Sequence, residues 1–325
     1  MKKFLIIIFA VVILAVIFAG GRTKTSNFSA GELLLPEIFG KGNANILFVG
    51  DMMFDRYIRK VGEERGEDFI FSCKDSNGTS LGDFLKSFDL VVGNLEGPIT
   101  NNLSISLGSV IESPENYVFT FPSSTAGLLA KNNIKLVNLG NNHINNFGEA
   151  GISSTKIFLS EASVNYFGLP SNRESSVDTE EIRGNNISFV SYNEFGNISA
   201  EEIIQKIKDQ KQNNRVVIVY AHWGEEYVPP PERVKTLARS FALAGADLIV
   251  GSHPHIIQES ETLRSTNSGQ VTYIYYSLGN FIFDQYWSEE VRTGLVLEAK
   301  IENGKIEISE HKVSLNRDGR TCLNK

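Results

Sequence analysis

The chain is poor in the residues that mark several classes of protein. Its 325 residues include only two cysteines, Cys73 and Cys322, and only five histidines. Lysine and arginine, 31 in all, are outnumbered by 38 aspartates and glutamates, and the net charge is −7. This lack of a basic excess argues against nucleic acid as a partner, because proteins that bind it normally present a basic face. The two cysteines can pair in an oxidising compartment or stay free, and the sequence leaves both open.

The first 22 residues differ in composition from the rest. Lys2 and Lys3 precede an apolar run from Phe4 to Ala19, a pattern typical of an export signal. We expect residues 1–22 to be a signal anchor in the cell membrane, with the rest of the chain facing outside. Cleavage after Ala19 would instead give a secreted protein. Since no cysteine follows the apolar run, a lipoprotein anchor is excluded.

The remaining sequence divides into a linker and one large domain. Residues 23–43 are polar with little periodicity and are predicted to be a linker. Residues 44–325 are long enough to bury a substantial core. Short apolar runs, typical of strands buried on both faces, alternate there with helical segments, which predicts an α/β fold. The Asn303-Gly304 pair predicts a type I′ turn in a hairpin over residues 294–314.

Polar residues follow five of the predicted strands. Ligands bind at the carboxyl ends of strands in open α/β folds, so these residues are expected to converge. One such residue alone is explained by a helix cap or a turn, but five sets are not. The candidate metal ligands and the neighbouring candidate catalytic histidine are Asp51, Glu96, Asn142, His143, His222, His253 and His255.

The mixture of donors predicts the metal. Carboxylate, amide and imidazole donors together suit Mn²⁺, Fe²⁺ or Zn²⁺ better than Ca²⁺ or Mg²⁺, which prefer oxygen alone. The candidates are too many for one tetrahedral site, so we expect two divalent metal ions bridged by a carboxylate.

Four further residues are candidates for substrate binding. Arg56 follows Asp51 closely and is positioned for an anionic substrate, although a solvated helix face also explains it. Asn280 is expected to line the pocket or to shape a tight turn. Trp223 is expected in a substrate groove, with core packing as the alternative. Glu226 is a candidate acid or base, or a charge at the rim.

The order of these motifs carries a family resemblance. The sequence resembles the CapA family of capsule and poly-γ-glutamate synthesis proteins over residues 45–300, and that family resembles the calcineurin-like metallophosphoesterases. The matching motifs are Gly50-Asp51, Asn94-Leu95-Glu96, Asn141-Asn142-His143, His222-Trp223-Gly224, Gly251-Ser252-His253-Pro254-His255 and Tyr276-Ser277-Leu278-Gly279-Asn280-Phe281.

The resemblance implies a fold and a role for each site residue. The implied fold is a four-layer α/β/β/α sandwich with the metal site at the strand ends. Glu96 takes the place of the bridging carboxylate, and His143 that of the histidine that protonates the leaving group. One metal would be held by Asn142, His222 and His253, and the other by Asp51 and His255.

The sequence departs from the implied pattern at three points. Met52 and Met53 follow Asp51 where the phosphoesterase motif Asp-x-His supplies an imidazole, so one metal site is expected to be weaker, empty or completed by another residue. Glu96 replaces a shorter aspartate. Asn146 stands where the CapA pattern usually has an aspartate, which removes one partner that would orient His143.

The function implied is a membrane-anchored, metal-dependent, hydrolase-like factor in the assembly, release or export of a polymer. The metals would polarise the scissile carbonyl or phosphoryl oxygen, with His143 as acid. The expected partners are an anionic polymer such as poly-γ-glutamate, other membrane subunits of a capsule synthesis machine and the lipid bilayer. A non-catalytic accessory subunit of an export complex and a surface phosphoesterase remain alternatives.

Overall fold

The structure is a computed structural model that describes residues 42–170, 172–213, 215–266 and 269–324. The expected signal anchor, residues 1–22, and nearly all of the linker lie outside the described residues. Among the helices that are described, none is both long enough and apolar enough to span a bilayer.

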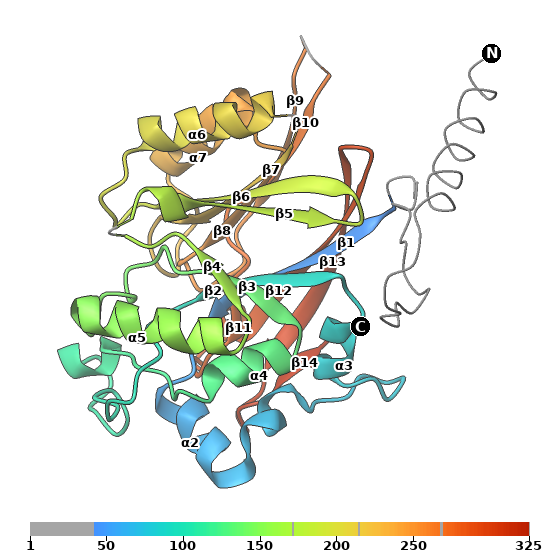
Figure 1. The fold of residues 1–325 in the computed structure, drawn as a ribbon. Helices are drawn as coiled ribbons and strands as arrows, with labels where there is room; N and C mark the ends of the chain where they lie inside the picture. Colours follow the sequence, from blue (N-terminus) through green and yellow to red (C-terminus); the bar gives the residue numbers. More distant parts are fainter. Residues whose placement is uncertain (1–41, 171, 214, 267–268, 325) are drawn as a thin grey trace, which may run out of the picture. The chain divides into compact units, whose positions relative to one another are not determined.

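Two mixed β-sheets form the centre of the domain (Figure 1). In the first sheet β1 to β4 run parallel, β11 pairs with β1, and β12 to β14 add an antiparallel edge. Its strands are β1 (Ala44–Met52), β2 (Leu90–Leu95), β3 (Ile134–Asn138), β4 (Asn165–Phe167), β11 (Asn280–Ile282), β12 (Thr293–Glu302), β13 (Lys305–Leu315) and β14 (Thr321–Leu323).

In the second sheet β6, β7, β8 and β10 run parallel, and an antiparallel strand borders each edge. Its strands are β5 (Val177–Ile182), β6 (Asn185–Asn193), β7 (Val216–His222), β8 (Leu248–Ser252), β9 (Ser260–Arg264) and β10 (Val271–Tyr275). The helices are α2 (Arg56–Arg65), α3 (Leu81–Lys86), α4 (Thr125–Lys131), α5 (Gly148–Glu161), α6 (Ala200–Gln212), α7 (Glu232–Ala244) and α8 (Glu289–Arg292).

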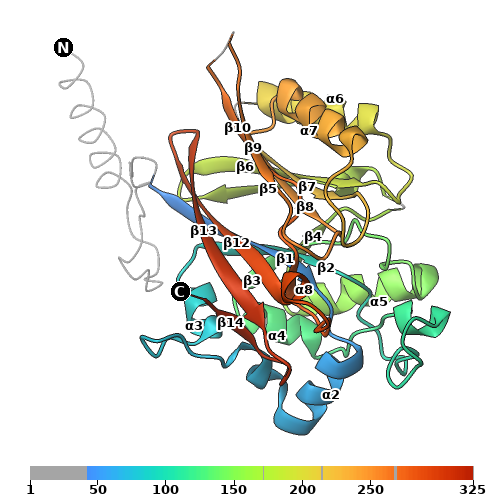
Figure 2. The same ribbon diagram turned by 180° about the vertical axis from the view of Figure 1, so that it is seen from behind.

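Alternate residues of the central strands face different layers. In β1, Ile46 and Phe48 pack into the core between the two sheets, while Leu47 faces a core with α4 and α5. In β7, Val217 packs instead against apolar residues of α6 and α7. Because side chains alternate along a strand, a continuous apolar run fills both faces. The layers therefore follow the order helices, sheet, sheet, helices (Figure 2).

The structure confirms the α/β class and the hairpin at the end of the chain. Asn303 and Gly304 both have positive φ, at 52° and 77°, as a type I′ turn requires, and they join β12 to β13. The segment around Asn280, considered as a tight turn, is partly a strand, since β11 pairs with β1. Its apolar residues are too few for that pairing to be predicted locally.

A disulfide joins β14 to the segment between α2 and α3. Cys73 and Cys322 are bonded, with a sequence separation of 249 and Cα atoms 5.2 Å apart. Of the two alternatives that the sequence left open, the structure shows the paired one. Such a bond stabilises the folded state mainly by lowering the conformational entropy of the unfolded chain. For a closed loop of this length, the chain-entropy model gives a stabilisation of about 5 kcal/mol.

Candidate metal centre

Five strands deliver polar side chains to one place where the two sheets meet. β1, β2 and β3 come from the first sheet, and β7 and β8 from the second. Two glycines permit this close approach: a Cβ on Gly50 would lie 1.9 Å from the carbonyl oxygen of Gly279, and one on Gly251 equally close to that of Tyr276. No other residue type fits at these two positions, so the glycines let the segments at Gly279 and Tyr276 pack directly against the ends of β1 and β8.

Glu96, His222 and His253 form the centre of the site. These three side chains are buried, and each offers a ligand atom within 4.8 Å of the others; among the described residues they make the one His/Cys/Asp/Glu cluster of this kind. Glu96 Oε1 lies 3.4 Å from His222 Nε2. Asn142 adds an amide oxygen 2.9 Å from the same nitrogen. The structure thus brings together four of the six predicted ligands.

Two atoms at this centre lack a hydrogen-bond partner. Glu96 Oε1 and His253 Nδ1 are both buried, and neither has a partner within the described part of the chain. A buried polar atom without a partner costs about 1–3 kcal/mol, so such atoms at one point call for an explanation. A cation bound among them would satisfy both.

The protonation states at the centre fit a divalent metal. Burial, together with the neighbouring histidines, lowers the pKa of His222 well below its usual value and that of His253 to about 4. Burial and the nearby Asp51 raise the pKa of Glu96 well above its usual value. The two imidazoles are therefore neutral, as metal binding requires, and the carboxylate requires a positive neighbour to ionise. The residues present fit a transition metal.

Ser252 fixes the orientation of His222. Its Oγ lies 3.0 Å from His222 Nδ1 and donates to the carbonyl oxygen of Ala221 at 3.3 Å. The Ser252 hydroxyl and the amide nitrogen of Asn94, 3.5 Å away, both face Nδ1 and hold the ring in place. Nε2 is the nitrogen that faces Glu96 and Asn142. Partners of this kind commonly hold metal-binding histidines in place.

The loop after β8 has a strained backbone. His253 has φ 94° and His255 has φ 59°, although neither is a glycine. Residues in this region cost about 1–3 kcal/mol and are retained where the surroundings fix them, often at functional sites. The backbone N–H of His253 donates to Asp51 Oδ2 at 3.1 Å, which joins this loop to β1.

Asp51 and His255 lie beside the centre and contact each other. His255 Nδ1 is 3.3 Å from Asp51 Oδ2 and 3.0 Å from Asn280 Oδ1. The amide nitrogen of Asn280 donates to the carbonyl oxygens of His255 and Val291 and to Gln285. Asn280 is completely buried, all of its polar atoms have partners, and its oxygen holds His255.

Asn94 was not predicted, although it connects the ligands of the first sheet. Its amide nitrogen donates to Asp51 Oδ1 at 2.8 Å and to Glu96 Oε2, and its oxygen accepts from Asn138 and Asn141 at 3.2 and 3.1 Å. The available signal was the recurrence of asparagine at the ends of β2 and β3. Those side chains form a buried amide network that also fixes the charged residues.

His143 lies next to the centre with one nitrogen occupied. Its Nδ1 is 3.1 Å from the carbonyl oxygen of Tyr117, which also accepts from Asn146, and its ring packs 4.4 Å from that of Phe119. Burial, then the neighbouring His255 and His253, lowers the pKa of His143 to about 3. The ring is therefore neutral at neutral pH in the metal-free protein.

Arg56 is held at the edge of the site and is not on a solvated helix face. It pairs with Asp284, donates to Asn116 Oδ1 at 3.2 Å, and its guanidinium lies about 5 Å from the ring centres of Phe119 and Phe283. The side chain is only 14% exposed. The ring of Phe119 contacts both Arg56 and His143, so it separates the guanidinium of Arg56 from the candidate catalytic histidine.

Aromatic residues form a rim beside the buried histidines. Phe195, 48% exposed, lies with its ring 4.5 Å from that of His253. Tyr227 packs against Trp287, which is 63% exposed, and against His255. Glu226 is half-buried, and its negative charge contributes to the raised pKa of Glu96, which places it near the rim. Exposed rings beside buried histidines are suited to contact a substrate.

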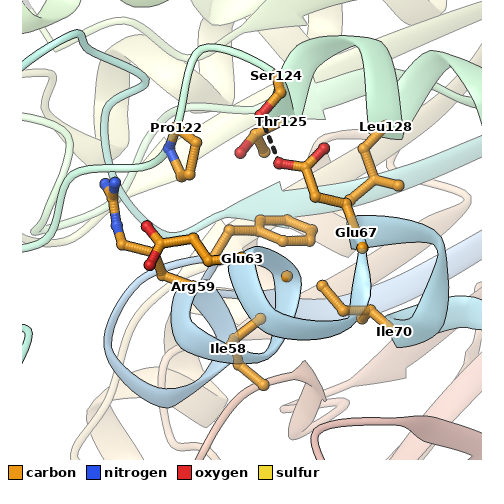
Figure 3. A pocket seen from close by; sticks show the side chains of 12 residues that line it. Ile58, Arg59, Glu63, Glu67, Ile70, Pro122, Ser124, Thr125 and Leu128 are labelled. Atoms are coloured by element: carbon orange, nitrogen blue, oxygen red, sulfur yellow. Dashed lines mark hydrogen bonds between the residues drawn. The ribbon is translucent and has the colours of Figure 1, made fainter.

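Trp223 lies in the core, as the packing alternative expected. It is completely buried, stacks on Phe241 and donates from its indole nitrogen to the carbonyl oxygen of Tyr276. A separate pocket lies between α2 and the start of α4, away from these residues (Figure 3). It is lined by Arg59, Glu63 and Glu67 among others, and none of the predicted metal ligands borders it.

Comparison with known proteins gives a family match over most of the domain. A family model described as "Bacterial capsule synthesis protein PGA_cap" matches residues 45–285. The chain is 28% identical over 275 residues to the "PGA biosynthesis protein CapA" of Bacillus subtilis (strain 168), covering 79% of this chain and 68% of that protein. It is 29% identical over 277 residues to the "Capsule biosynthesis protein CapA" of Bacillus anthracis, covering 79% and 64%. The chain thus spans about two thirds of the length of these relatives.

Proposed function

This chain belongs to the CapA family of bacterial capsule synthesis proteins, and from that premise we propose that it is a metal-dependent hydrolase acting on an anionic capsule polymer. The step would be a cleavage in polymer assembly, release or export. Poly-γ-glutamate is the candidate substrate, because a relative at 28% identity is described as a PGA biosynthesis protein. We include in this proposal that the family is related to the metallophosphoesterases and that this chain has their fold.

The observation that carries the proposal is the unsatisfied centre. Glu96 Oε1 and His253 Nδ1 are buried without hydrogen-bond partners in the described part of the chain, beside a neutral His222 whose Nε2 faces Glu96 and Asn142. If the site bound only an organic ligand, we would expect the protein to supply hydrogen-bond partners for these two atoms. A divalent ion held by Glu96, Asn142, His222 and His253 would supply Lewis-acid polarisation of the scissile carbonyl or phosphoryl oxygen.

The chain's own residues would bind and orient the polymer. Arg56 is a candidate for a carboxylate of the substrate, since it is fixed in direction by Asp284 and Asn116. His143 has Nε2 available to a bound group because Nδ1 is occupied by Tyr117. Phe195 and Tyr227 would cover the apolar parts of the polymer at the rim. Assignment of His143 as the acid stays a prediction.

We further propose a location and partners. The apolar run from Phe4 to Ala19 would anchor the chain in the cell membrane with the domain outside, or be cleaved to release it. The Cys73–Cys322 disulfide supports an oxidising compartment for the domain. Other membrane subunits of the synthesis machine would be its neighbours.

The test is the length of poly-γ-glutamate after incubation with the full chain and Mn²⁺. Shorter polymer with the wild type, unchanged polymer with Glu96→Gln, and wild-type activity in the surface control His311→Ala would support a hydrolase. Unchanged polymer with a chain that does bind metal would contradict it.

One observation favours a second function, that of a non-catalytic accessory subunit. Met52 and Met53 fill the place of the phosphoesterase imidazole, and both are completely buried in the core. If the polymer stays intact while the metal is bound, this role is supported. Hydrolysis of bis-p-nitrophenyl phosphate without cleavage of poly-γ-glutamate would instead support a surface phosphoesterase.

A further inference from the structure

We propose that the site holds one metal ion rather than two. In this proposal Glu96, Asn142, His222 and His253 bind the ion, whereas Asp51 and His255 are positioning residues that bind each other. This inference shares one requirement with the proposed function, which is that a metal binds at this centre. It differs from the two-metal arrangement that the motifs predict.

The oxygens of Asp51 are already engaged by the protein. Oδ1 accepts from the amide of Asn94 at 2.8 Å. Oδ2 accepts from the backbone N–H of His253 at 3.1 Å and lies 3.3 Å from His255 Nδ1. A carboxylate with N–H donors on both oxygens differs sharply from Glu96, whose Oε1 has no hydrogen-bond partner within the described ranges.

His255 is similarly committed. Its Nδ1 faces two oxygens, those of Asp51 and Asn280, so it carries the ring proton and only Nε2 is left as a ligand atom. The ring is packed between Phe283, at 4.9 Å, and Tyr227, at 6.0 Å between ring centres. Without a bridging Glu96, one remaining nitrogen beside an engaged carboxylate is a poor set for a second ion, since zinc sites use at least three protein ligands.

Apart from Glu96, whose Oε2 already accepts from the amide of Asn94, the sequence offers no third ligand to this second position. Met52 packs in the core beside Gly93, and Met53 accepts the backbone N–H of Asp55 at its sulfur, 3.0 Å away. Within the described ranges, Asp51 and His255 are not part of a three-residue ligand cluster like that of Glu96, His222 and His253. The place of the missing imidazole is therefore taken by apolar side chains that turn inward.

Asp51 and His255 have a structural task that explains their presence. The hydrogen bond from the His253 N–H to Asp51 fixes a backbone that has φ 94° and that aims the His253 ring at the centre. Asn280 and Asp51 together fix His255, two residues further on. This pair thus pre-organises the loop that carries one ligand of the single metal.

The experiment counts the bound metal. The full chain is stripped with a chelator, loaded with Mn²⁺ and desalted, and its metal is measured by elemental analysis and electron paramagnetic resonance. We expect about one Mn²⁺ per chain, with the spectrum of an isolated ion. About two ions per chain with the spectrum of an exchange-coupled pair would overturn the inference and leave the proposed function standing. No bound metal would overturn both.

Three variants provide a second test of the number of bound metal ions. Asp51→Asn keeps an acceptor oxygen, and we expect it to retain about one ion with altered anisotropy of the Mn²⁺ spectrum, because His253 is oriented differently. His253→Ala should lose the ion, and the control His311→Ala should match the wild type. A fall from about two ions to about one in Asp51→Asn would identify Asp51 as a ligand and contradict the proposal.

Discussion

The two sheets bring different chemistry to the same point. The first supplies a carboxylate and amides, with Glu96, Asn94 and Asn142 following β2 and β3 or lying within them. The second supplies imidazoles, with His222 ending β7 and His253 following β8. Neither sheet alone offers a complete ligand set. The centre therefore exists only when the sheets are packed together, and substitutions on the two sides should weaken it differently.

Removing the imidazole side should have the largest effect. The double variant His222→Ala/His253→Ala deletes both nitrogen ligands of the second sheet, and we expect Mn²⁺ affinity to fall by about 1,000-fold or more. Isothermal titration of the chelator-stripped chain measures this. His311→Ala, a histidine paired with Glu298 on the β12–β13 hairpin, is the control. Binding retained within about threefold would show that the second sheet does not supply the nitrogen ligands.

Removing only the carboxylate should weaken binding less and leave the fold intact. Glu96→Gln keeps the shape of the side chain, and we expect about 100-fold weaker Mn²⁺ binding. The raised pKa of Glu96 means that the metal-free carboxyl is held neutral, so the neutral amide should change the free energy of unfolding by less than about 1 kcal/mol. Urea unfolding with chelator present measures this, with the exposed Glu64→Gln as control. A large loss of stability would show that Glu96 is mainly structural.

The orienting residues of the two sides should differ in a further way. We expect Ser252→Ala, on the second sheet, to weaken Mn²⁺ binding by about 10–100-fold with little change in stability. Asn94→Ala, on the first, should weaken binding similarly and also cost about 2–4 kcal/mol in unfolding free energy, because Asp51 and Glu96 each lose a donor. Titration and urea unfolding of both variants, beside the exposed Asn186→Ala, separate the two effects. Equal stability of the two variants would contradict this difference between the sheets.

The smallest effect on metal binding is expected at Asn280. Its loss leaves the backbone oxygens of His255 and Val291 without a donor, so Asn280→Ala should lower the unfolding free energy by about 1–3 kcal/mol. Mn²⁺ affinity, measured by the same titration, should change by less than about threefold if His255 is not a ligand. A loss of affinity as large as that of Ser252→Ala would instead make His255 part of the metal site.

The sequence predicted the parts of the site that depend on strand ends. Apolar runs marked β1, β2, β3, β7 and β8, and the polar residue after each run does lie at the common edge. Periodicity also predicted the α/β class and the turn at Asn303. These features are local, because a buried strand and a tight turn require particular residues where they occur.

The features that the sequence did not predict depend on contacts between distant segments. Asn94 has the same residue type as many loop asparagines, and three of its four hydrogen bonds arise only when β1, β2 and β3 are side by side. The burial of Arg56 follows from Phe119 and Phe283, which are remote in sequence. Phe195 at the rim had no periodic pattern to mark it. Tertiary packing decided each of these.

Anomalous diffraction from crystals of the full chain loaded with Mn²⁺ would locate the metal itself. We predict a single anomalous peak among the side chains of Glu96, His222 and His253, where two buried atoms lack partners in the described structure. A peak elsewhere, or no peak at this centre in a chain that otherwise diffracts well, would contradict the assignment of these residues as a metal centre.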